Sequence, residues 1–388
     1  EKRDRVLQRM AQAGWNVQDA LDSPIPIYAV SPLGKFKHAA FAQASISWLE
    51  DNFEKRQLYT TGLNVFTSLD IVAQKETERV FNKKIQLFTK TLGLPKTPPL
   101  EGAAVLIDPN SGYLKAVYGG TIQSPYDFSR ATQARRQAGS SFKPVVYSLA
   151  FSSLNTKKGR LWTPFDTVPN QRRTFPNTNG WRPRNNGGRY SSKSTLTKAL
   201  TKSENIATAS LLEQLGGPQE LIDFSTRMGF DTTAYPLEMG LALGQGEVTP
   251  LEMGCFVAML ANGGNQVYGI PVTHAIDRNG NNHVYITGLG RRLMSVQTAT
   301  LTREIMRLVI LQGTGGSSRG ANGEKGYTGT AFGKTGTTDQ NKDVWFVGST
   351  PTYSGALWLG YDKPINLKAS ASDLASPLWG WWMRAVHN

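Results

Sequence analysis

The sequence predicts an α+β fold in which an antiparallel β-sheet is sandwiched between helical layers, with a small N-terminal linker region in front of it. Two observations lead to this prediction. Apolar, strand-like segments occur just after residue 102 and again after residue 332, whereas most of the sequence between them has helical periodicity. Strands from distant parts of the chain are therefore expected to meet in one sheet, and the intervening helices to cover it.

The first 99 residues are predicted to precede the main domain. Helices are expected at 1–14, 17–21, 35–53 and 70–92, and a strand at 62–66. The last of these helices carries a regular apolar face, and Gly93 and Pro95 end it. The proline-containing run 96–99 is typical of a linker. We therefore expect two regions, 1–99 and 100–388.

The second region opens with a predicted hairpin, whose strands at 103–107 and 113–118 flank a turn at 108–112. Helices follow, most of them ended by a glycine, at 143–151, 205–215, 218–228, 249–260 and 295–311. The chain then returns to strands at 333–337, 344–347 and 356–360. A Trp-rich helix after Pro377 closes it.

Composition narrows the classes of function. The formal net charge of +14 favours an anionic environment, such as nucleic acid, acidic lipid headgroups or an acidic polymer. No apolar run approaches the roughly 18 residues that a membrane-spanning helix requires. The single cysteine, Cys255, cannot form a disulfide within the chain, and the four histidines have no partner at metal-ligand spacing. We therefore expect no metal and no other cofactor.

Three short motifs follow one another along the chain: S-S-F-K at 140–143, S-E-N at 203–205 and K-T-G-T at 334–337. A serine hydroxyl is a poor nucleophile at neutral pH, so it needs a base within about 3 Å and donors for the developing oxyanion. Ser140 precedes an apolar run and is expected at a helix start, with Lys143 on the same face. We interpret Ser140 as a nucleophile and Lys143 as its base.

Lys143 can accept a proton only if its pKa falls from about 10.4 toward 7. Burial and a second cation both lower the pKa of an amine, and Lys334 is the candidate for that cation. Asn205 is suited to hold the Lys143 amine by a hydrogen bond, and Ser203 to relay the proton to a leaving amine. Glu204 is expected to face outward as a solvated charge.

The K-T-G-T segment is predicted to be a sheet strand beside the site. Gly336 would let a substrate approach the backbone closely. The N–H groups of Ser140 and Thr337 are expected to form an oxyanion hole. Lys334 and the hydroxyls of Thr335 and Thr337 are expected to bind a substrate carboxylate.

These motifs resemble the signature shared by penicillin-binding proteins and serine β-lactamases. Most of the chain resembles the transpeptidase region of a class A, bifunctional penicillin-binding protein, with further similar stretches at 101–120, 136–140, 312–315 and 345–348. The segments 5–10 and 62–70 are similar to the tail of that family's glycosyltransferase domain and the linker after it. The resemblance implies that the glycosyltransferase itself lies outside these residues.

The resemblance implies a D,D-transpeptidase that cross-links peptidoglycan outside the cytoplasmic membrane, as a soluble part of a membrane-anchored parent. Ser140 would attack the carbonyl between the two terminal D-alanines of a donor stem peptide and pass the acyl group to an acceptor amine. β-Lactam antibiotics would be trapped as acyl-enzymes on Ser140. The implied partners are stem peptides, β-lactams, the glycosyltransferase domain of the same parent chain, and an anionic cell-wall or membrane surface.

Several alternatives remain open at this point. A β-lactamase-like hydrolase would need a carboxylate that positions water, which the sequence does not identify, and a penicillin-binding receptor would be acylated without catalysing cross-linking. A phosphate loop at 328–335 is disfavoured, because Thr328 stands where glycine is required. Nucleic acid is not expected as a partner. The arginine-rich stretch 172–190 is as compatible with a basic lip for cell-wall strands as with a solvated loop.

Overall fold

The computed structural model describes residues 2–19, 37–54, 58, 62–121, 124–155, 159–176, 178–285 and 287–388. The chain divides into two compact units, Glu1–Lys37 and His38–Asn388. The first unit contains α1 (Lys2–Gln12), and every element discussed below belongs to the second.

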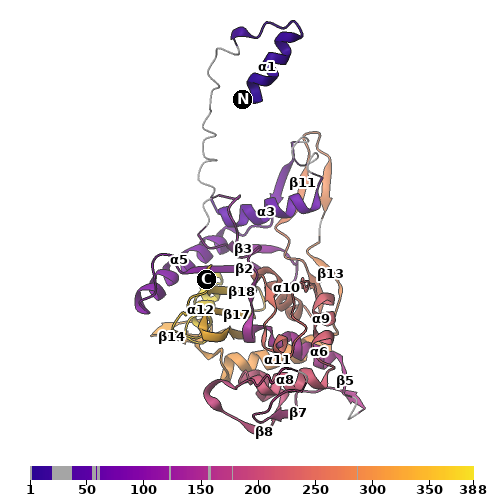
Figure 1. The fold of residues 1–388 in the computed structure, drawn as a ribbon, viewed down its shortest axis with the longest axis vertical. Coiled ribbons are helices and arrows are strands. Elements are labelled where there is room, and N and C mark those ends of the chain that lie inside the picture. The colour runs from indigo at the N-terminus through magenta and orange to yellow at the C-terminus, as the bar shows by residue number, and fades with distance from the viewer. Residues whose placement is uncertain are drawn as a thin grey trace. The chain divides into compact units, whose positions relative to one another are not determined.

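A five-stranded antiparallel sheet forms the centre of the second unit (Figure 1). In spatial order its strands are β16 (Phe332–Thr337), β17 (Asp343–Ser349), β18 (Ser354–Gly360), β2 (Glu101–Ile107) and β3 (Leu114–Tyr118). The predicted hairpin is the pair β2 and β3, and β18 joins it to the three C-terminal strands. Segments from both ends of this unit's sequence thus share one sheet.

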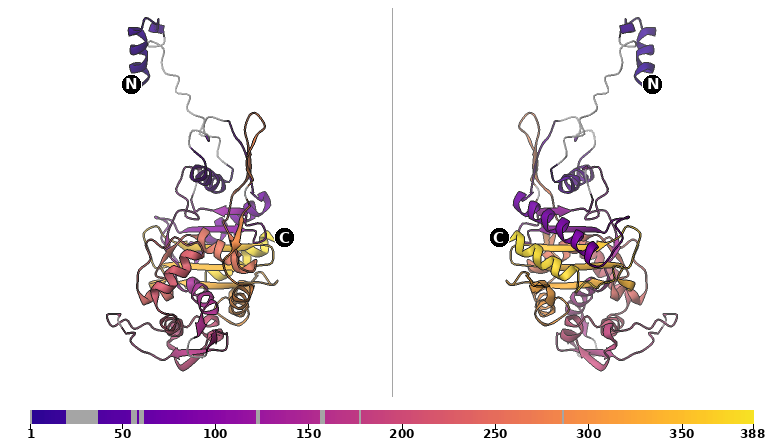
Figure 2. Two further views of the ribbon diagram at one scale, coloured as in Figure 1. Left: turned by 90° about the vertical axis from the view of Figure 1, so that its right-hand side faces the viewer. Right: turned by 90° about the vertical axis from the view of Figure 1, so that its left-hand side faces the viewer.

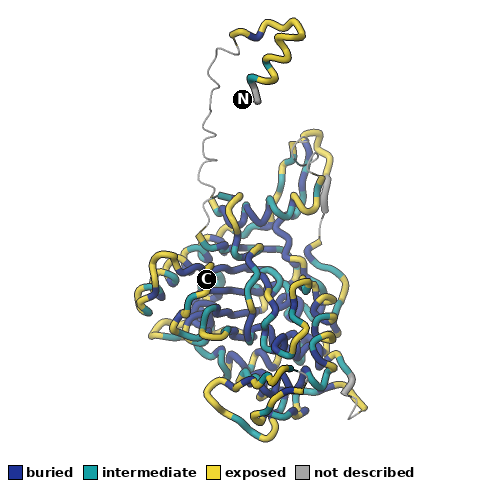
Figure 3. Tube along the Cα trace, in the orientation of Figure 1, coloured by how far each residue is buried: buried dark blue, intermediate teal, exposed yellow. Residues whose placement is uncertain are grey.

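Alternate side chains of the sheet enter two separate hydrophobic cores, because successive residues of a strand point to opposite faces. Val105 and Ile107 of β2 belong to one core, whereas Ala104 and Leu106 belong to the other. Figure 3 shows the strands buried along their length. Burial on both faces explains why these strands are apolar without a polar alternation.

Helices cover both faces of the sheet. On one face, α5 (Ile71–Thr91) and α12 (Ala375–Val386) lie side by side (Figure 2). The rings of Phe81 and Trp382 meet edge to face at 5.4 Å, and Trp382 Nε1 donates to Thr77 Oγ1. The helices on the other face are α6 (Lys143–Ser152), α8 (Asn205–Gln214), α10 (Pro250–Ala261) and α11 (Val296–Gln312).

Several helices begin where a side chain caps them. Asp70 accepts hydrogen bonds from the N–H groups of Val72 and Ala73 at the start of α5. Thr249 and Glu252 form a reciprocal capping box at α10. Ser295 caps α11 by accepting from the Thr298 N–H.

Shorter elements surround this framework. Three of them form a small sheet in the order β1 (Asn64–Thr67), β11 (Val272–Ile276) and β12 (Asn282–Tyr285). Two-stranded pairs are β4 (Arg136–Gln137) with β9 (Glu247–Val248), β5 (Leu154–Asn155) with β6 (Arg160–Leu161), β7 (Thr167–Asn170) with β8 (Ser191–Thr195), β10 (Asn265–Val267) with β13 (Leu289–Arg292), and β14 (Gly320–Ala321) with β15 (Glu324–Lys325). The other helices are α3 (Ala39–Asn52), α7 (Leu196–Thr201) and α9 (Pro218–Arg227).

The predicted α+β class, with a sheet between helical layers, is confirmed. Residues 35 and 36 of the helix predicted at 35–53 lie outside the described residues. The helix α3 begins at Ala39, after His38, which adopts a left-handed conformation with φ of 64°. Residues 20 and 21 of the helix predicted at 17–21 lie outside the described residues. The strand predicted at 62–66 is β1, but its pairing with β11 and β12 in a small sheet was not predicted, because that pairing joins distant segments.

The described residues contain neither a candidate membrane-spanning helix nor a candidate metal site. None of their helices combines the length and the apolar character needed to cross a bilayer. Nor do three or more of their His, Cys, Asp and Glu side chains gather in a geometry able to hold a metal ion.

Candidate active site

Three segments that are far apart in the sequence meet beside the edge strand β16. Ser140 lies in the short 3-10 helix η1 (Gly139–Phe142), directly before α6. Ser203 lies in the turn between α7 and α8, and Lys334 lies in β16. Ser203 Oγ is 3.3 Å from Lys143 Nζ and 2.9 Å from Lys334 Nζ. The structure therefore brings the three sequence motifs into one cluster.

The turn at Ser140 aligns it with Lys143. The Lys143 N–H donates to the Ser140 carbonyl, which is the bond of a 3-10 helix, and side chains three residues apart eclipse in that helix. Ser140 is half-buried. Its neighbour Ser141 is fully buried, and the Ser141 hydroxyl donates to the Ala138 carbonyl. Of these two serines, Ser140 is the one that a substrate can reach.

The backbone of η1 packs directly on the backbone of β16. A Cβ atom at Gly336 would lie 2.5 Å from the Ala138 carbonyl oxygen and 2.8 Å from the Ser141 nitrogen. Gly139 has φ of 52°, and a Cβ atom there would lie 2.6 Å from the Thr337 carbonyl oxygen. Both positions therefore require glycine, which lets the Ser140 and Thr337 backbones approach each other.

Lys143 is fully buried and held by three acceptors. Its Nζ donates to the Ser203 carbonyl at 2.8 Å and to Asn205 Oδ1 at 2.7 Å, and it contacts Ser203 Oγ at 3.3 Å. Burial, followed by the positive charge of Lys334, lowers the pKa of Lys143 well below its ordinary value. Burial thus favours the neutral form of this amine.

Lys334 is also fully buried. Its Nζ donates to Ser203 Oγ at 2.9 Å and to the Thr335 carbonyl at 2.9 Å. Burial lowers the pKa of Lys334 to about 7. Ser203 thus lies between two buried amines, and burial lowers the pKa of both.

The pleat of β16 separates the side chains of the K-T-G-T motif. Lys334 pairs with Val347, which belongs to the core beneath α6, whereas Thr335 pairs with Phe346 of the opposite core. The Thr335 hydroxyl is 2.6 Å from Thr314 Oγ1. Thr314 is a polar partner of the strand to which the sequence analysis gave no role.

Thr337 shares its face of the sheet with Thr335, two residues before it. Its Oγ1 accepts a hydrogen bond from the Ala371 N–H at 3.0 Å. The hydroxyls of Thr335 and Thr337 are therefore each oriented by a local partner.

The turn that carries Ser203 has an unusual conformation and an unexpected support. Ser203 has φ of 57°, a left-handed conformation that is rare outside glycine and frequent at functional sites. The buried Asn185 caps α8, because its Oδ1 accepts from the N–H groups of Asn205 and Ile206 at 2.8 and 3.0 Å. Asn205 Nδ2 in turn donates to the Arg184 carbonyl at 2.7 Å.

The sequence analysis missed Asn185. It grouped this segment by its arginines and aromatic residues, and no local pattern indicated that an asparagine there would cap a helix beginning 20 residues later. Within the stretch, Arg173 pairs with Glu213 of α8 and packs over Phe175, and Arg172 packs over Tyr190. The stretch is therefore fastened to the helix that carries Asn205.

The prediction for Glu204 was wrong. This residue is only 9% exposed, and its Oε2 is buried. The reason is that Glu204 is the residue at the N-cap of α8, where the chain turns inward between Ser203 and Asn205. A residue in the middle of a surface helix can point its side chain into solvent, but a residue in this turn cannot.

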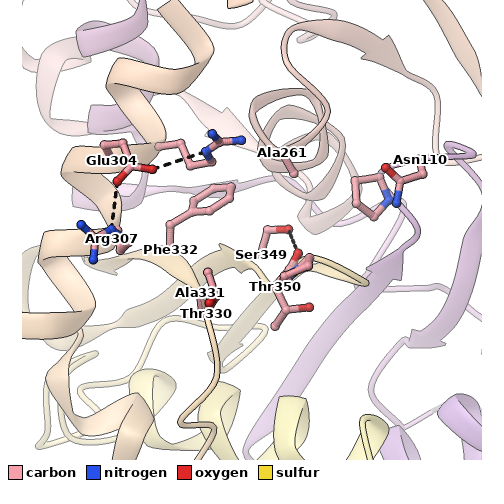
Figure 4. A pocket seen from close by; sticks show the side chains of 12 residues that line it. Asn110, Ala261, Glu304, Arg307, Thr330, Ala331, Phe332, Ser349 and Thr350 are labelled. Atoms are coloured by element: carbon pink, nitrogen blue, oxygen red, sulfur yellow. Dashed lines mark hydrogen bonds and ion pairs between the residues drawn. The ribbon is translucent and has the colours of Figure 1, made fainter.

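A separate cavity of about 330 Å³ lies at the other end of β16 (Figure 4). Phe332 and Thr350 line it, and Glu304 of α11 pairs with Arg303 and Arg307 beside it. Its lining within the described part of the chain includes none of the motif residues. This cavity is therefore separate from the motif cluster around Ser203.

Comparison with known proteins agrees with this geometry. The family described as penicillin binding protein transpeptidase domain matches residues 102–364. Penicillin-binding protein 1A of Neisseria lactamica is 35% identical over 294 residues, which are 74% of this chain and 36% of that protein. Penicillin-binding protein 1B of Vibrio cholerae is 31% identical over 384 residues, which are 96% of this chain and 47% of that protein. The chain thus spans less than half the length of these relatives.

A solved structure has a similar fold over most of this chain. The PonA1 protein from Mycobacterium tuberculosis in complex with penicillin V has a TM-score of 0.72 and 27% sequence identity. The match covers 90% of this chain and 93% of that one. The similarity therefore extends beyond the residues that the family comparison covers.

Proposed function

The chain belongs to the family of penicillin-binding protein transpeptidase domains, and from this premise we propose that it is a serine-type D,D-transpeptidase that cross-links peptidoglycan stem peptides. The observation that carries the proposal is the buried row of contacts from Lys334 through Ser203 to Lys143, next to the accessible Ser140. Such a row supplies a base and a proton path beside a nucleophile.

The contacts of Lys143 suit it to act as the base. The Ser203 carbonyl and Asn205 Oδ1 can only accept hydrogen bonds, so they hold the two N–H groups of a neutral amine and leave its lone pair free. In acylation, Ser140 Oγ bonds to the donor carbonyl carbon and its proton moves to Lys143 Nζ. The proton then passes through Ser203 to the nitrogen of the leaving D-alanine as the C–N bond breaks.

The backbone contact between η1 and β16 supports an oxyanion hole. We assign its two donors to the N–H groups of Ser140 and Thr337. Gly336 lets the η1 backbone pack against β16, and Lys334 attracts the terminal carboxylate. Because the Thr337 oxygen accepts from Ala371, its O–H can donate to that carboxylate. Thr335 contributes together with Thr314, to which its hydroxyl is bonded.

The acyl-enzyme is then resolved by an acceptor amine, whose nitrogen bonds to the acyl carbon as the bond between Ser140 Oγ and that carbon breaks. The proton lost by the amine passes through Lys143 to Ser140 Oγ. A β-lactam acylates Ser140 in the same way. Its leaving nitrogen stays tethered to the acyl group by the opened ring system, so it occupies the place of the acceptor. The acyl-enzyme therefore persists, and the protein is inhibited.

We also propose the cellular setting that the family resemblance implies. Residues 1–99 are the tail of a glycosyltransferase domain and the interdomain linker, and residues 100–388 are the transpeptidase domain. The similarity to the Vibrio cholerae protein, which extends over 96% of this chain, supports this division. The parent is membrane-anchored and works on the outer side of the cytoplasmic membrane, where the positive charge of the chain faces an anionic wall or membrane.

The nucleophile is tested by the intact mass of the protein after exposure to benzylpenicillin, followed by peptide mapping. We expect one added penicilloyl group on Ser140, and none in Ser140→Ala. Ser141→Ala is the matched control, because it removes the adjacent buried hydroxyl and is expected to leave acylation in place. Undiminished labelling of a folded Ser140→Ala variant would exclude Ser140.

A second measurement distinguishes a transpeptidase from a hydrolase or a receptor. Given a stem peptide that ends in D-Ala-D-Ala and an acceptor amine, the protein should release D-alanine and form the cross-linked product. Hydrolysed peptide as the main product would favour a hydrolase, whereas a penicillin adduct without any turnover of the peptide would favour a receptor.

A further inference from the structure

A buried carboxylate lies at the centre of the motif cluster, and the mechanism above does not use it. Glu204 stands between Ser203 and Asn205, is only 9% exposed and does not cap α8 with its side chain. Within the described part of the chain, no group donates a hydrogen bond to its Oε2, which is shielded from water. A negative charge in such a place is costly unless a positive charge lies nearby.

The neighbours of Glu204 show which charge that is. Lys143 Nζ bonds to the residues on both sides of Glu204, through the Ser203 carbonyl and Asn205 Oδ1. The carboxylate raises the pKa of Lys143, against the larger effect of burial and the opposing effect of Lys334. These two groups, Lys334 on β16 and Glu204 before α8, are the described charges whose fields act on Lys143.

The charge of Glu204 also acts on Tyr147, which lies one turn along α6 from Lys143. Its hydroxyl is 3.3 Å from Thr208 Oγ1, which itself donates to the Glu204 carbonyl. Burial raises the pKa of Tyr147, and Glu204 raises it further, so this phenol stays neutral near Lys143. Because Tyr147 stays neutral, the groups of the cluster that can carry charge are the amines of Lys143 and Lys334 and the carboxylate of Glu204.

We propose that Glu204 is a positioning residue that acts through Lys143: its negative charge offsets that of Lys334, so that Lys143 can hold the proton taken from Ser140. The inference rests on the proposed function and deepens it. When Ser140 Oγ bonds to the substrate carbon, the neutral Lys143 becomes an ammonium ion beside Lys334. Without a buried anion, two adjacent cations would oppose this step.

The same charge has a consequence in the resting protein. It favours the protonated form of Lys143, in which Lys143 cannot act as a base. Glu204 therefore strengthens the base once it is neutral and raises the pH at which it becomes neutral. These two effects have opposite signs in a pH profile, which makes the proposal testable.

The experiment measures the second-order rate constant for acylation of the full chain by a fluorescent penicillin as a function of pH. In Glu204→Gln, we expect the acid limb of the profile to move down by about one pH unit, as for the loss of a nearby opposite charge. We expect the plateau above the limb to fall by roughly threefold, because a weaker base is a less effective one. At the most acidic pH values, the variant is then faster than the wild type.

Three further variants sharpen the result. Glu204→Asp keeps the charge and should return the limb close to its wild-type position. Glu213→Gln makes the same charge change on the same helix at the Arg173 pair and should leave the profile unchanged. Glu204→Met fills the same volume and should shift the limb as Glu204→Gln does, which provides the measurement if the glutamine variant does not fold.

A limb that stays in place in the neutral variants, with the rate lowered at every pH, would show a merely structural role and overturn the inference. In that case Ser140 would still be acylated and the proposed function would stand. If the wild type itself is not acylated, the proposed function fails and the inference fails with it.

Discussion

At the scale of single residues, two buried lysines share one serine hydroxyl. Ser203 Oγ lies within hydrogen-bonding distance of both Lys143 and Lys334, and neither lysine has an acidic partner in direct contact among the described residues. Buried lysines without such a partner are uncommon, because desolvation opposes their charge. Burial accordingly lowers the pKa of both amines, which favours their neutral forms.

Loss of the base should slow acylation strongly. Lys143→Ala removes the amine that accepts the Ser140 proton, and we expect the rate of acylation by a fluorescent penicillin to fall by roughly 10² to 10⁴. Lys198→Ala on α7 removes an exposed lysine and serves as the control. Wild-type kinetics in a folded Lys143→Ala variant would assign the base elsewhere.

Lys334 should make stability depend on pH. Its pKa is about 7 in the folded protein against 10.5 for an ordinary lysine. Between these values the unfolded chain binds more protons, so the free energy of unfolding rises with pH, by at most about 1.4 kcal/mol per pH unit for this one group. The gain is complete above the unfolded value and is lost progressively as the pH falls toward 7.

Denaturant unfolding at several pH values between about 7 and 10 checks this prediction. Lys334→Met should show a shallower rise than the wild type. Lys193→Met changes the charge equally at an exposed position and should keep the wild-type slope. Equal slopes in the wild type and Lys334→Met would contradict the prediction.

At the scale of elements, the site depends on how helices and strands end. The first turn of α8 carries Asn205, but its N–H groups are capped by Asn185 from a loop and not by the adjacent Glu204. Strand β16 presents Lys334 to one side and Thr335 and Thr337 to the other, as a period of two requires. Residue propensities predict where these helices and strands lie. Which group caps a helix, and which side chains a strand presents to each side, depend on the segments that pack against it.

Removal of the distant cap should affect both stability and chemistry. Asn185→Ala leaves the N–H groups of Asn205 and Ile206 without this acceptor, so we expect a loss of about 1 to 2 kcal/mol in the free energy of unfolding. Acylation should slow as well, since Asn205 orients Lys143. The control is Asn186→Ala, which changes an exposed neighbour. Equal free energies of unfolding for the two variants would show that the Asn185 cap does not stabilise α8.

At the scale of the whole molecule, the sheet and the site require both ends of the second unit. Strand β2 pairs with β18, and α5 covers the same face of the sheet as α12. The segment 38–99, which the sequence analysis assigned to a linker region, contributes Phe81 and Phe88 of α5 to that core. Its apolar face explains why this helix was predicted correctly from 70 to 92.

Truncations should reveal which part of the N-terminal region the fold needs. A chain of residues 38–388 keeps the entire second unit, so we expect the thermal unfolding temperature and penicillin acylation of the full chain. A chain of residues 100–388 lacks α5 and exposes the core beside Leu106 and Trp382. We expect it to aggregate or to unfold at a lower temperature. Equal behaviour of the two truncations would show that α5 is dispensable.

The strands of the central sheet, the principal helices and the residues of the three motifs could be predicted from the sequence, because apolar periodicity and motif spacing are local properties. The cap of Asn185 on α8 and the burial of Glu204 near Lys143 became apparent only in the tertiary structure. The same is true of Thr314 as the partner of Thr335. Each of these depends on which distant segment packs against a given residue, and burial and hydrogen-bond partners follow from that packing and not from the neighbours in sequence.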